Sequence, residues 1–221
     1  MLRFWLPSQN ELRFSPAKID SMPKKTMVST VVSTLPAFDP ETGDLNVIVD
    51  TPKGNRNKFK YDEGLGLFKL SGVLAAGTVF PFDFGFVPST LGEDGDNLDV
   101  LMLMDEPAFV GCLVNARLIG VIEAQQTEGG KTERNDRLIA IASHSHNHKD
   151  VKTLGDINVN LLTEIEHFFI SYNEVRGKKF KPEGRYGPEK AERLVKQGEK
   201  YFRQNQEGGS KKSNGHKGKN R

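Results

Sequence analysis

Three aspartates within six residues are the strongest chemical feature of this sequence. Asp94, Asp96 and Asp99 lie close together, and Gly95 frees the backbone between the first two. Carboxylates at this spacing repel one another unless a positive charge lies among them. Hard cations such as Mg²⁺ and Ca²⁺ take oxygen ligands, and Mg²⁺ often shares its ligand shell between carboxylates and substrate phosphates. The spacing therefore favours a divalent metal site.

Two simpler interpretations compete with that site. An EF-hand loop starting at Asp94 would need glycine at its sixth position and glutamate at its twelfth, where this chain has Asp99 and Asp105. An Asp-Gly turn between two strands is common and needs no ligand. The third aspartate, at the start of the apolar run 98–104, shifts the balance from a plain turn toward a metal site.

The flanks of this motif carry a family resemblance. Residues 94–100, D-G-D-N-L-D-V, resemble the signature of the family I soluble inorganic pyrophosphatases, D-G-D-x-x-D followed by an apolar residue. Residues 84–91, F-G-F-V-P-S-T-L, are similar to that family's Y-G-F-I-P-x-T. The resemblance covers residues 45–202. It implies a Mg²⁺-dependent hydrolase that splits pyrophosphate into two phosphates by means of a metal-activated water.

The same resemblance assigns the acidic residues. Asp94 and Asp99 would ligate metal ions, and Asp50 would join them in place of a family glutamate. Asp96 would orient or deprotonate the attacking water. Paired metal ions can lower the pKa of a bridging water and screen phosphate oxygens, which is the chemistry that phosphoanhydride hydrolysis requires.

Three further residues match family positions that hold the substrate. Lys58 falls on the lysine that contacts phosphate, and Arg137 falls on a second family lysine. Tyr172, in the sequence F-F-I-S-Y, matches a late tyrosine. An arginine adds a bidentate fork but lacks the compact charge of lysine.

Several other positions depart from the family pattern. The replacements are Lys60 for an acid, Gly72 for a phosphate-binding arginine, Phe80 and Phe84 for tyrosines, Gln126 and Asn135 for metal-binding aspartates, and Asn173 for a lysine. Each lost donor in a charged site removes roughly 2–4 kcal/mol of transition-state stabilisation. The alternative hypothesis is therefore a pyrophosphatase-like protein with lost or altered catalysis, which binds metal or phosphate or has a structural role. Residues that could compensate are Asp136, Glu133 and Glu128 for the acids and Lys69 for the arginine.

Composition sets wider limits. A chain of 221 residues with 36% hydrophobic content can bury one good core. It has no apolar run near 18 residues, so we expect no membrane span. The single Cys112 excludes an internal disulfide framework, and together with the absence of a signal-peptide pattern it favours a cytoplasmic protein. The expected partners are pyrophosphate or a related phosphoanhydride and further copies of the chain.

The order of the elements predicts the fold class. Short β-rich runs, among them 30–35, 45–49 and 65–74, precede two helical patterns at 161–175 and from Pro188 onward. The polar stretch 125–135 is expected to be a loop. This order indicates an α+β, mainly β domain. The resemblance implies an OB-like, five-stranded closed barrel with flanking C-terminal helices.

The ends of the chain differ from its middle. Residues 1–30 are expected to form a partly ordered N-terminal extension, residues 31–204 the pyrophosphatase-like domain, and residues 205–221 a disordered basic tail. The tail carries five Lys or Arg against Glu207. The basic pI therefore comes from the ends of the chain, so we expect nucleic acid to bind at most weakly through this tail.

Overall fold

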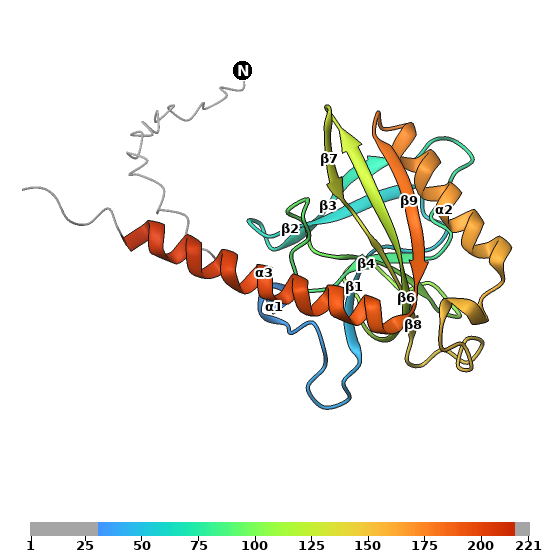
Figure 1. The fold of residues 1–221 in the computed structure, drawn as a ribbon, viewed down its shortest axis with the longest axis horizontal. Helices are drawn as coiled ribbons and strands as arrows, with labels where there is room; N and C mark the ends of the chain where they lie inside the picture. The colour runs from blue at the N-terminus through green and yellow to red at the C-terminus, as the bar shows by residue number, and fades with distance from the viewer. Residues whose placement is uncertain (1–30, 215–221) are drawn as a thin grey trace, which may run out of the picture.

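A ring of five strands forms the centre of the molecule (Figure 1). The computed structural model describes residues 31–214, and the predictions for residues 1–30 and 215–221 lie outside this range. Around the ring the order is β1-β4-β5-β8-β6, and β6 pairs back with β1 to close it. Only β5 and β8 run parallel among these five pairs. The predicted OB-like barrel of five strands is confirmed.

Eight strands precede the first long helix, and a ninth strand separates the two long helices. Their bounds are α1 Val31–Thr34, β1 Leu45–Thr51, β2 Asn57–Asp62, β3 Leu67–Val73, β4 Asp83–Phe86, β5 Asp99–Leu103, β6 Leu113–Glu128, β7 Lys131–Arg134, β8 Arg137–Ala142, a 3-10 turn at Leu154–Asp156, α2 Val159–Glu174, β9 Lys179–Tyr186 and α3 Pro188–Asn214. In Figure 1 α2 and α3 lie against different sides of the barrel.

The two helices explain why the barrel strands are apolar on both faces. Along β5 the side chains of Leu101 and Leu103 pack in a cluster that includes Phe169 of α2. The alternate residues Val100 and Met102 belong to a second cluster that includes residues of α3. Side chains alternate between the faces of a strand, so a strand covered on both sides needs an unbroken apolar run.

Gly85 in β4 marks the closest approach between barrel strands. It pairs with Val49 of β1 on one side and with Val100 of β5 on the other. A Cβ atom at position 85 would overlap the backbone carbonyl of Ile48 and lie 3.0 Å from the Cα atom of Val49. Both obstacles are backbone, which cannot move without disturbing the ladder.

We therefore expect Gly85→Ala to lower the free energy of unfolding by about 2–4 kcal/mol, because the added methyl group has no space in the ladder. Urea denaturation measures this. The matched control is Gly72→Ala, whose Cβ would meet only the end of the flexible Arg176 side chain, at 3.5 Å. Equal stability of the two variants would contradict the prediction.

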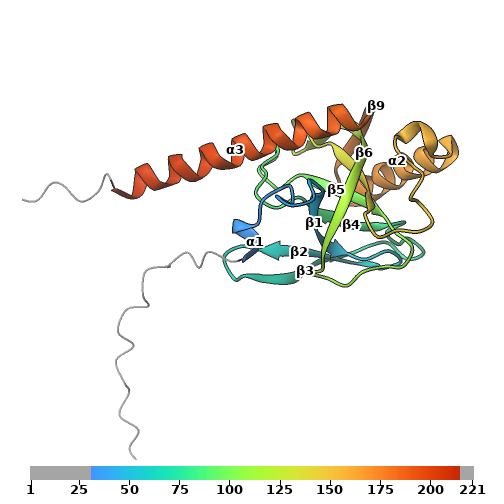
Figure 2. The same ribbon diagram turned by 90° about the horizontal axis from the view of Figure 1, so that it is seen from below.

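The β2–β3 hairpin is a sheet of its own. These two strands pair with each other and, within the described residues, form no ladder with the barrel. Figure 2 shows the hairpin on the side of the barrel opposite α3. The hairpin carries Lys58 and Lys60, so it brings basic side chains to the barrel from outside the closed ring.

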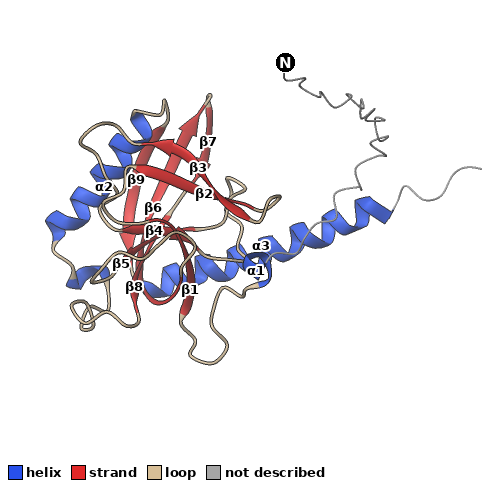
Figure 3. Ribbon diagram, turned by 180° about the vertical axis from the view of Figure 1, so that it is seen from behind, coloured by secondary structure: helices blue, strands red, loops and turns tan. Residues whose placement is uncertain are grey.

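Two predictions for local structure are wrong. Residues 30–35 were expected as a strand, but Val31–Thr34 form one helical turn, because no neighbouring strand is in place to pair with this β-branched run. The expected loop at 125–135 is a hairpin in which β6 continues to Glu128 and β7 returns (Figure 3). Gly129 and Gly130 both have positive φ, which allows the two-residue turn that polar composition alone does not reveal.

The last helix is longer than the sequence suggests. α3 runs to Asn214 and so passes position 204, where the sequence predicts the tail to begin. Residues 205–207 are exposed and yet helical. Glutamine and glutamate favour the helix even where no side chain is buried. Within the described part of the chain, no helix is both long and apolar enough to cross a membrane.

Candidate active site

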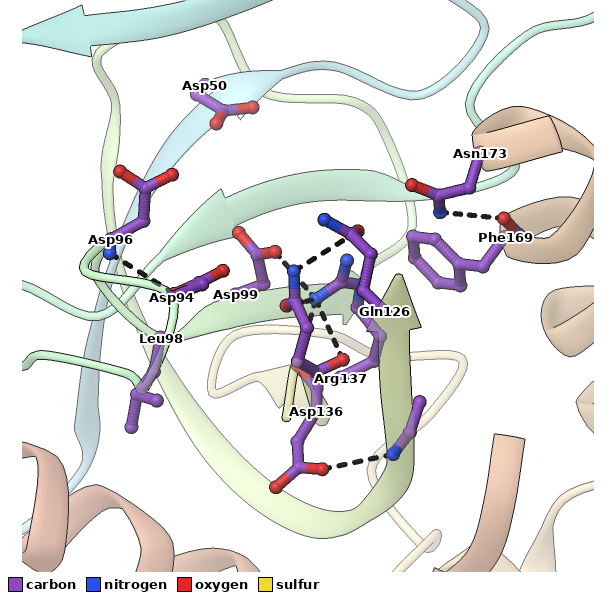
Figure 4. A network of polar contacts seen from close by, with 12 residues as sticks. Asp50, Asp94, Asp96, Leu98, Asp99, Gln126, Asp136, Arg137, Phe169 and Asn173 are labelled. Carbon is purple, nitrogen blue, oxygen red and sulfur yellow. Dashed lines mark hydrogen bonds and ion pairs between the residues drawn. The ribbon is translucent and has the colours of Figure 1, made fainter. Parts of the chain in front are cut away.

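One cavity of about 230 Å³ lies where the barrel, the β2–β3 hairpin and the end of α2 meet. The structure brings together around it all seven residues that the sequence singles out, namely Asp50, Lys58, Asp94, Asp96, Asp99, Arg137 and Tyr172. Figure 4 shows the four aspartate side chains around the same space. The residues come from distant parts of the chain, so the cavity is a product of the fold and not of one loop.

Asp99 and Arg137 face each other because two parallel strands begin together. Val100 of β5 is in register with Leu138 of β8, which places the preceding residues side by side. The Arg137 guanidinium lies 2.7 Å from the Asp99 carboxylate and is 4% exposed. The rings of Phe169 and Phe180 lie 5.0 and 5.2 Å from it. A cation this deeply buried requires a carboxylate in contact.

Asp50 and Lys58 form a second buried pair. The Lys58 ammonium donates to both carboxylate oxygens of Asp50 at 2.7 Å, and the two side chains are 13% and 8% exposed. It also lies 4.2 Å from the ring centre of Phe84 and 5.6 Å from that of Phe80. Burial raises the pKa of Asp50 to about 6, against the lowering effect of Lys58.

This pKa gives a stability prediction with a definite sign. Because the folded-state pKa of Asp50 lies above the ordinary aspartate value, its contribution to stability is complete at low pH and is lost as the pH rises through about 6. Lys58→Met removes the compensating charge. We expect it to cost about 3 kcal/mol at pH 8 and much less at pH 5, where Asp50 is protonated.

Urea denaturation in Mg²⁺-free buffer at both pH values measures this effect. Lys69→Met is the control, because Lys69 forms only an exposed pair with Asp62. Adding Asp50→Asn to Lys58→Met should recover most of the loss at pH 8. A loss that is the same at pH 5 and pH 8 would contradict the prediction.

The loop that carries the aspartate motif is shaped by its glycine. Gly95 has φ of 84°, and the backbone N–H of Asp96 donates to the Asp94 carboxylate at 3.2 Å. Burial, together with the negative charges of Asp99 and Asp96, raises the pKa of Asp94 to about 6. The negative charges of these carboxylates therefore repel one another, and a bound cation would reduce this repulsion.

Asp96 is held less firmly than the other acids. Its carboxylate is 2.7 Å from the Lys60 ammonium, and the two side chains are 57% and 59% exposed. Exposed ion pairs contribute up to about 1 kcal/mol, so this contact is easily exchanged for another. Lys60, which reverses the sign of a family acid, thus neutralises the aspartate that is most exposed among the four at the cavity.

Helix α3 supports the loop from behind. The backbone N–H of Leu91 donates to the carbonyl of Gly198 at 3.1 Å. A Cβ atom at Gly198 would lie 2.8 Å from the Leu98 side chain and 3.2 Å from Thr90. The glycine lets the helix backbone reach the loop directly, so the position of the aspartates depends on α3.

The carboxylate oxygens of the four cavity aspartates are ligands of the kind that a hard divalent cation prefers. Within the described residues, however, no three acidic, histidine or cysteine side chains approach closely enough to hold one ion together. Asp50, Asp96 and Asp99 each face a basic side chain instead. Metal binding here would require the carboxylates to share their oxygens with, or turn away from, these basic side chains.

Comparison with known proteins agrees with this geometry. The family model described as inorganic pyrophosphatase matches residues 47–203. The chain belongs to the inorganic pyrophosphatase family. An inorganic pyrophosphatase of Synechocystis sp. is 36% identical over 147 residues, which are 66% of this chain and 84% of that protein. A soluble inorganic pyrophosphatase of Oryza sativa is 32% identical over 171 residues, covering 75% and 78%.

Solved structures show the same relationship. The crystal structure of the inorganic pyrophosphatase from Thermus thermophilus superposes with a TM-score of 0.71 at 29% identity, covering 78% of this chain and 98% of that one. The inorganic pyrophosphatase from Neisseria gonorrhoeae gives 0.70 at 30% identity, with the same coverage. The resemblance inferred from the aspartate motif is confirmed.

Two positions where the sequence departs from the pyrophosphatase pattern form an amide pair. The Asn135 amide donates to the Gln126 side-chain oxygen at 3.3 Å, and the Asn135 oxygen accepts from Arg137. Both amides line the cavity. Their oxygens are already used by neighbours, so these positions add no negative charge and little free capacity for a metal ion.

The acids considered as substitutes lie elsewhere. Asp136 pairs with Arg134, Glu133 with Lys131, and Glu128 with Lys178. None of these three acids lines the 230 Å³ cavity, and neither does Lys69, the candidate for the missing arginine. Asp136 instead lines a neighbouring pocket together with Asp94 and Asp99, so compensation by any of these four residues stays a prediction.

Sequence reasoning missed two basic residues at the cavity, Arg176 and Lys178. They follow α2 in a turn, where no periodic pattern marks them. The one available signal was their position four and six residues after Tyr172, which the resemblance had already placed in the site.

Proposed function

We propose that this protein is a Mg²⁺-dependent inorganic diphosphatase that hydrolyses pyrophosphate to two phosphates. The observation that carries the proposal is the arrangement of charge around one cavity. Asp94 and Asp96 approach from one loop and Asp99 from the start of the strand that follows it, whereas Lys58 and Arg137 approach from a hairpin and a second barrel strand. Acids suit metal ions and cations suit phosphate oxygens, which are the two things that pyrophosphate hydrolysis must bring together.

The residues divide the work by their surroundings. Asp96 accepts the proton of the attacking water, and its exposed pair with Lys60 leaves it free to do so. In this proposal Lys58, Arg137 and Tyr172 hold the substrate. Burial raises the pKa of Tyr172, so its hydroxyl stays neutral and donates to a phosphate oxygen.

Phosphate release from pyrophosphate tests this proposal directly. We expect turnover that requires Mg²⁺ and falls by at least about 100-fold in Asp96→Asn, which keeps the shape but loses the proton acceptor. Asp150→Asn is the control, because Asp150 is exposed in a distant turn. Wild-type protein without turnover across a broad range of Mg²⁺ and pH would overturn the enzymatic proposal.

Mg²⁺ binding can be measured without turnover. In calorimetry we expect Asp94→Asn and Asp99→Asn each to weaken Mg²⁺ binding by at least about tenfold, because each removes one charged ligand. Asp94→Asn is the cleaner variant, since Asp99 also supports the buried Arg137. Binding curves identical to that of the wild type would contradict the assignment of these metal ligands.

The second candidate is a binding protein that has lost or altered catalysis. The amide pair of Gln126 and Asn135 favours it, because a site with fewer acids holds metal ions less strongly. Such a protein would bind Mg²⁺ or phosphate in calorimetry and yet release no phosphate from pyrophosphate. The two measurements together therefore separate the candidates.

Assembly and location complete the proposal. The β2–β3 hairpin exposes Leu67, Leu70 and Val73 by 62, 59 and 61%, which supports a homo-oligomer that covers this apolar surface. Sedimentation equilibrium tests it, and a monomer at micromolar concentration would contradict it. The free cysteine Cys112 supports a cytoplasmic location.

A further inference from the structure

Basic side chains around the cavity differ in whether they already have an acidic partner. Five of them line it. Four form ion pairs, each 2.7 Å long: Lys58 with Asp50, Lys60 with Asp96, Arg137 with Asp99 and Lys178 with Glu128. For Arg176, no carboxylate of residues 31–214 lies within ion-pair distance. Arg176 is thus the cation that can take an anion without giving one up.

The chain fixes the Arg176 guanidinium in a definite place. Arg176 follows the last turn of α2, and Gly177 reverses the backbone with φ of 74°. Its guanidinium donates to the Tyr172 hydroxyl at 2.8 Å and lies 5.1 Å from the centre of that ring. The Tyr172 ring stacks in turn on Phe168, with centroids 5.9 Å apart. An aromatic stack therefore holds the guanidinium at the cavity wall.

Gly72 on the neighbouring hairpin leaves room for this side chain. A Cβ atom added at position 72 would lie 3.5 Å from the Arg176 Nη1 atom, and it would have no other neighbour within 4 Å. A long side chain at position 72 would compete for the space that the guanidinium uses. Gly72 on β3 and Arg176 after α2 therefore border the same space at the cavity wall.

We infer that Arg176 binds a phosphate group of the substrate at this place. The inference rests on the proposed function and adds to it a substrate-binding residue. A guanidinium presents two parallel N–H donors to a phosphate and stays charged at any working pH. The family resemblance puts a phosphate-binding arginine at position 72 on β3, whereas here the same chemical group reaches the cavity from the end of α2.

A purely structural role is the competing explanation. Arginine near a helix C-terminus often donates to the last free carbonyls of the helix. Within the described residues, the Arg176 side chain donates to the Tyr172 hydroxyl and to no backbone carbonyl. The side chain is also exposed, so it contributes little to the core. The Arg176 guanidinium is therefore placed at the cavity and does not cap the helix.

The first test compares Arg176→Ala with wild type. We expect kcat/KM for pyrophosphate to fall about 10–100-fold, as for the loss of one hydrogen-bonded charge. The affinity for methylenediphosphonate, a non-hydrolysable analogue, should fall by a similar factor in calorimetry with Mg²⁺ present. Arg193→Ala is the control with the same charge change, because Arg193 is exposed on α3 and does not line the 230 Å³ cavity. It should leave both values unchanged.

The second test moves the arginine between the two positions. Gly72→Arg combined with Arg176→Ala should regain at least about fivefold of the lost affinity and kcat/KM, because position 72 opens on the same place. Gly72→Arg alone should weaken binding, since two guanidinium groups would then compete for one space. A merely structural role for Arg176 predicts no such rescue.

The outcomes separate this inference from the proposed function. If wild type turns over pyrophosphate and Arg176→Ala matches it within twofold in kcat/KM and in analogue binding, the inference is overturned and the function stands. If wild type shows no turnover, the function is overturned, and analogue binding alone decides on Arg176. A double variant no better than Arg176→Ala would overturn the shared place of positions 72 and 176.

Discussion

A buried guanidinium governs the charge of the cavity wall. Arg137 lies beneath the rings of Phe169 and Phe180, where a lone cation would be strongly destabilising. The parallel register of β5 and β8 places Asp99 beside it, and their ion pair joins the two strands at the edge of the cavity. Any ligand that uses Asp99 must therefore share this carboxylate with Arg137, which couples the acidic side of the cavity to its basic side.

Charge in this cavity is balanced mainly by the protein itself. Where the family resemblance expects acids, the chain has Lys60 and the amide pair of Gln126 and Asn135, and a further cation, Arg176, lies at the wall. Each of these changes makes the surroundings of the aspartate loop less negative. Side chains thus carry part of the positive charge that bound ions would otherwise have to provide.

The sequence predicts those parts of the site that depend on local motifs. The spacing of Asp94, Asp96 and Asp99 indicated a metal site, and the family resemblance placed Lys58 beside it. The β6–β7 hairpin and β9 were not predicted, because their residues are polar and their stability comes from pairing with β6. Arg176 was missed for a related reason, since its role depends on the empty space at Gly72, 104 positions earlier in the chain.

The cavity has one wall on the closed ring and another on the separate β2–β3 sheet. Asp99 and Arg137 stand on strands of the closed ring, where a shift would break several backbone ladders at once. Lys58 and Lys60 stand on a hairpin that, in the described part of the chain, shares no ladder with that ring. Side-chain contacts join the hairpin to the barrel instead, among them the buried Asp50–Lys58 ion pair and the hydrogen bond from the Phe59 N–H to the Thr51 hydroxyl. A ligand that competes for Asp50 or Lys58 therefore acts on a contact that holds this wall in place.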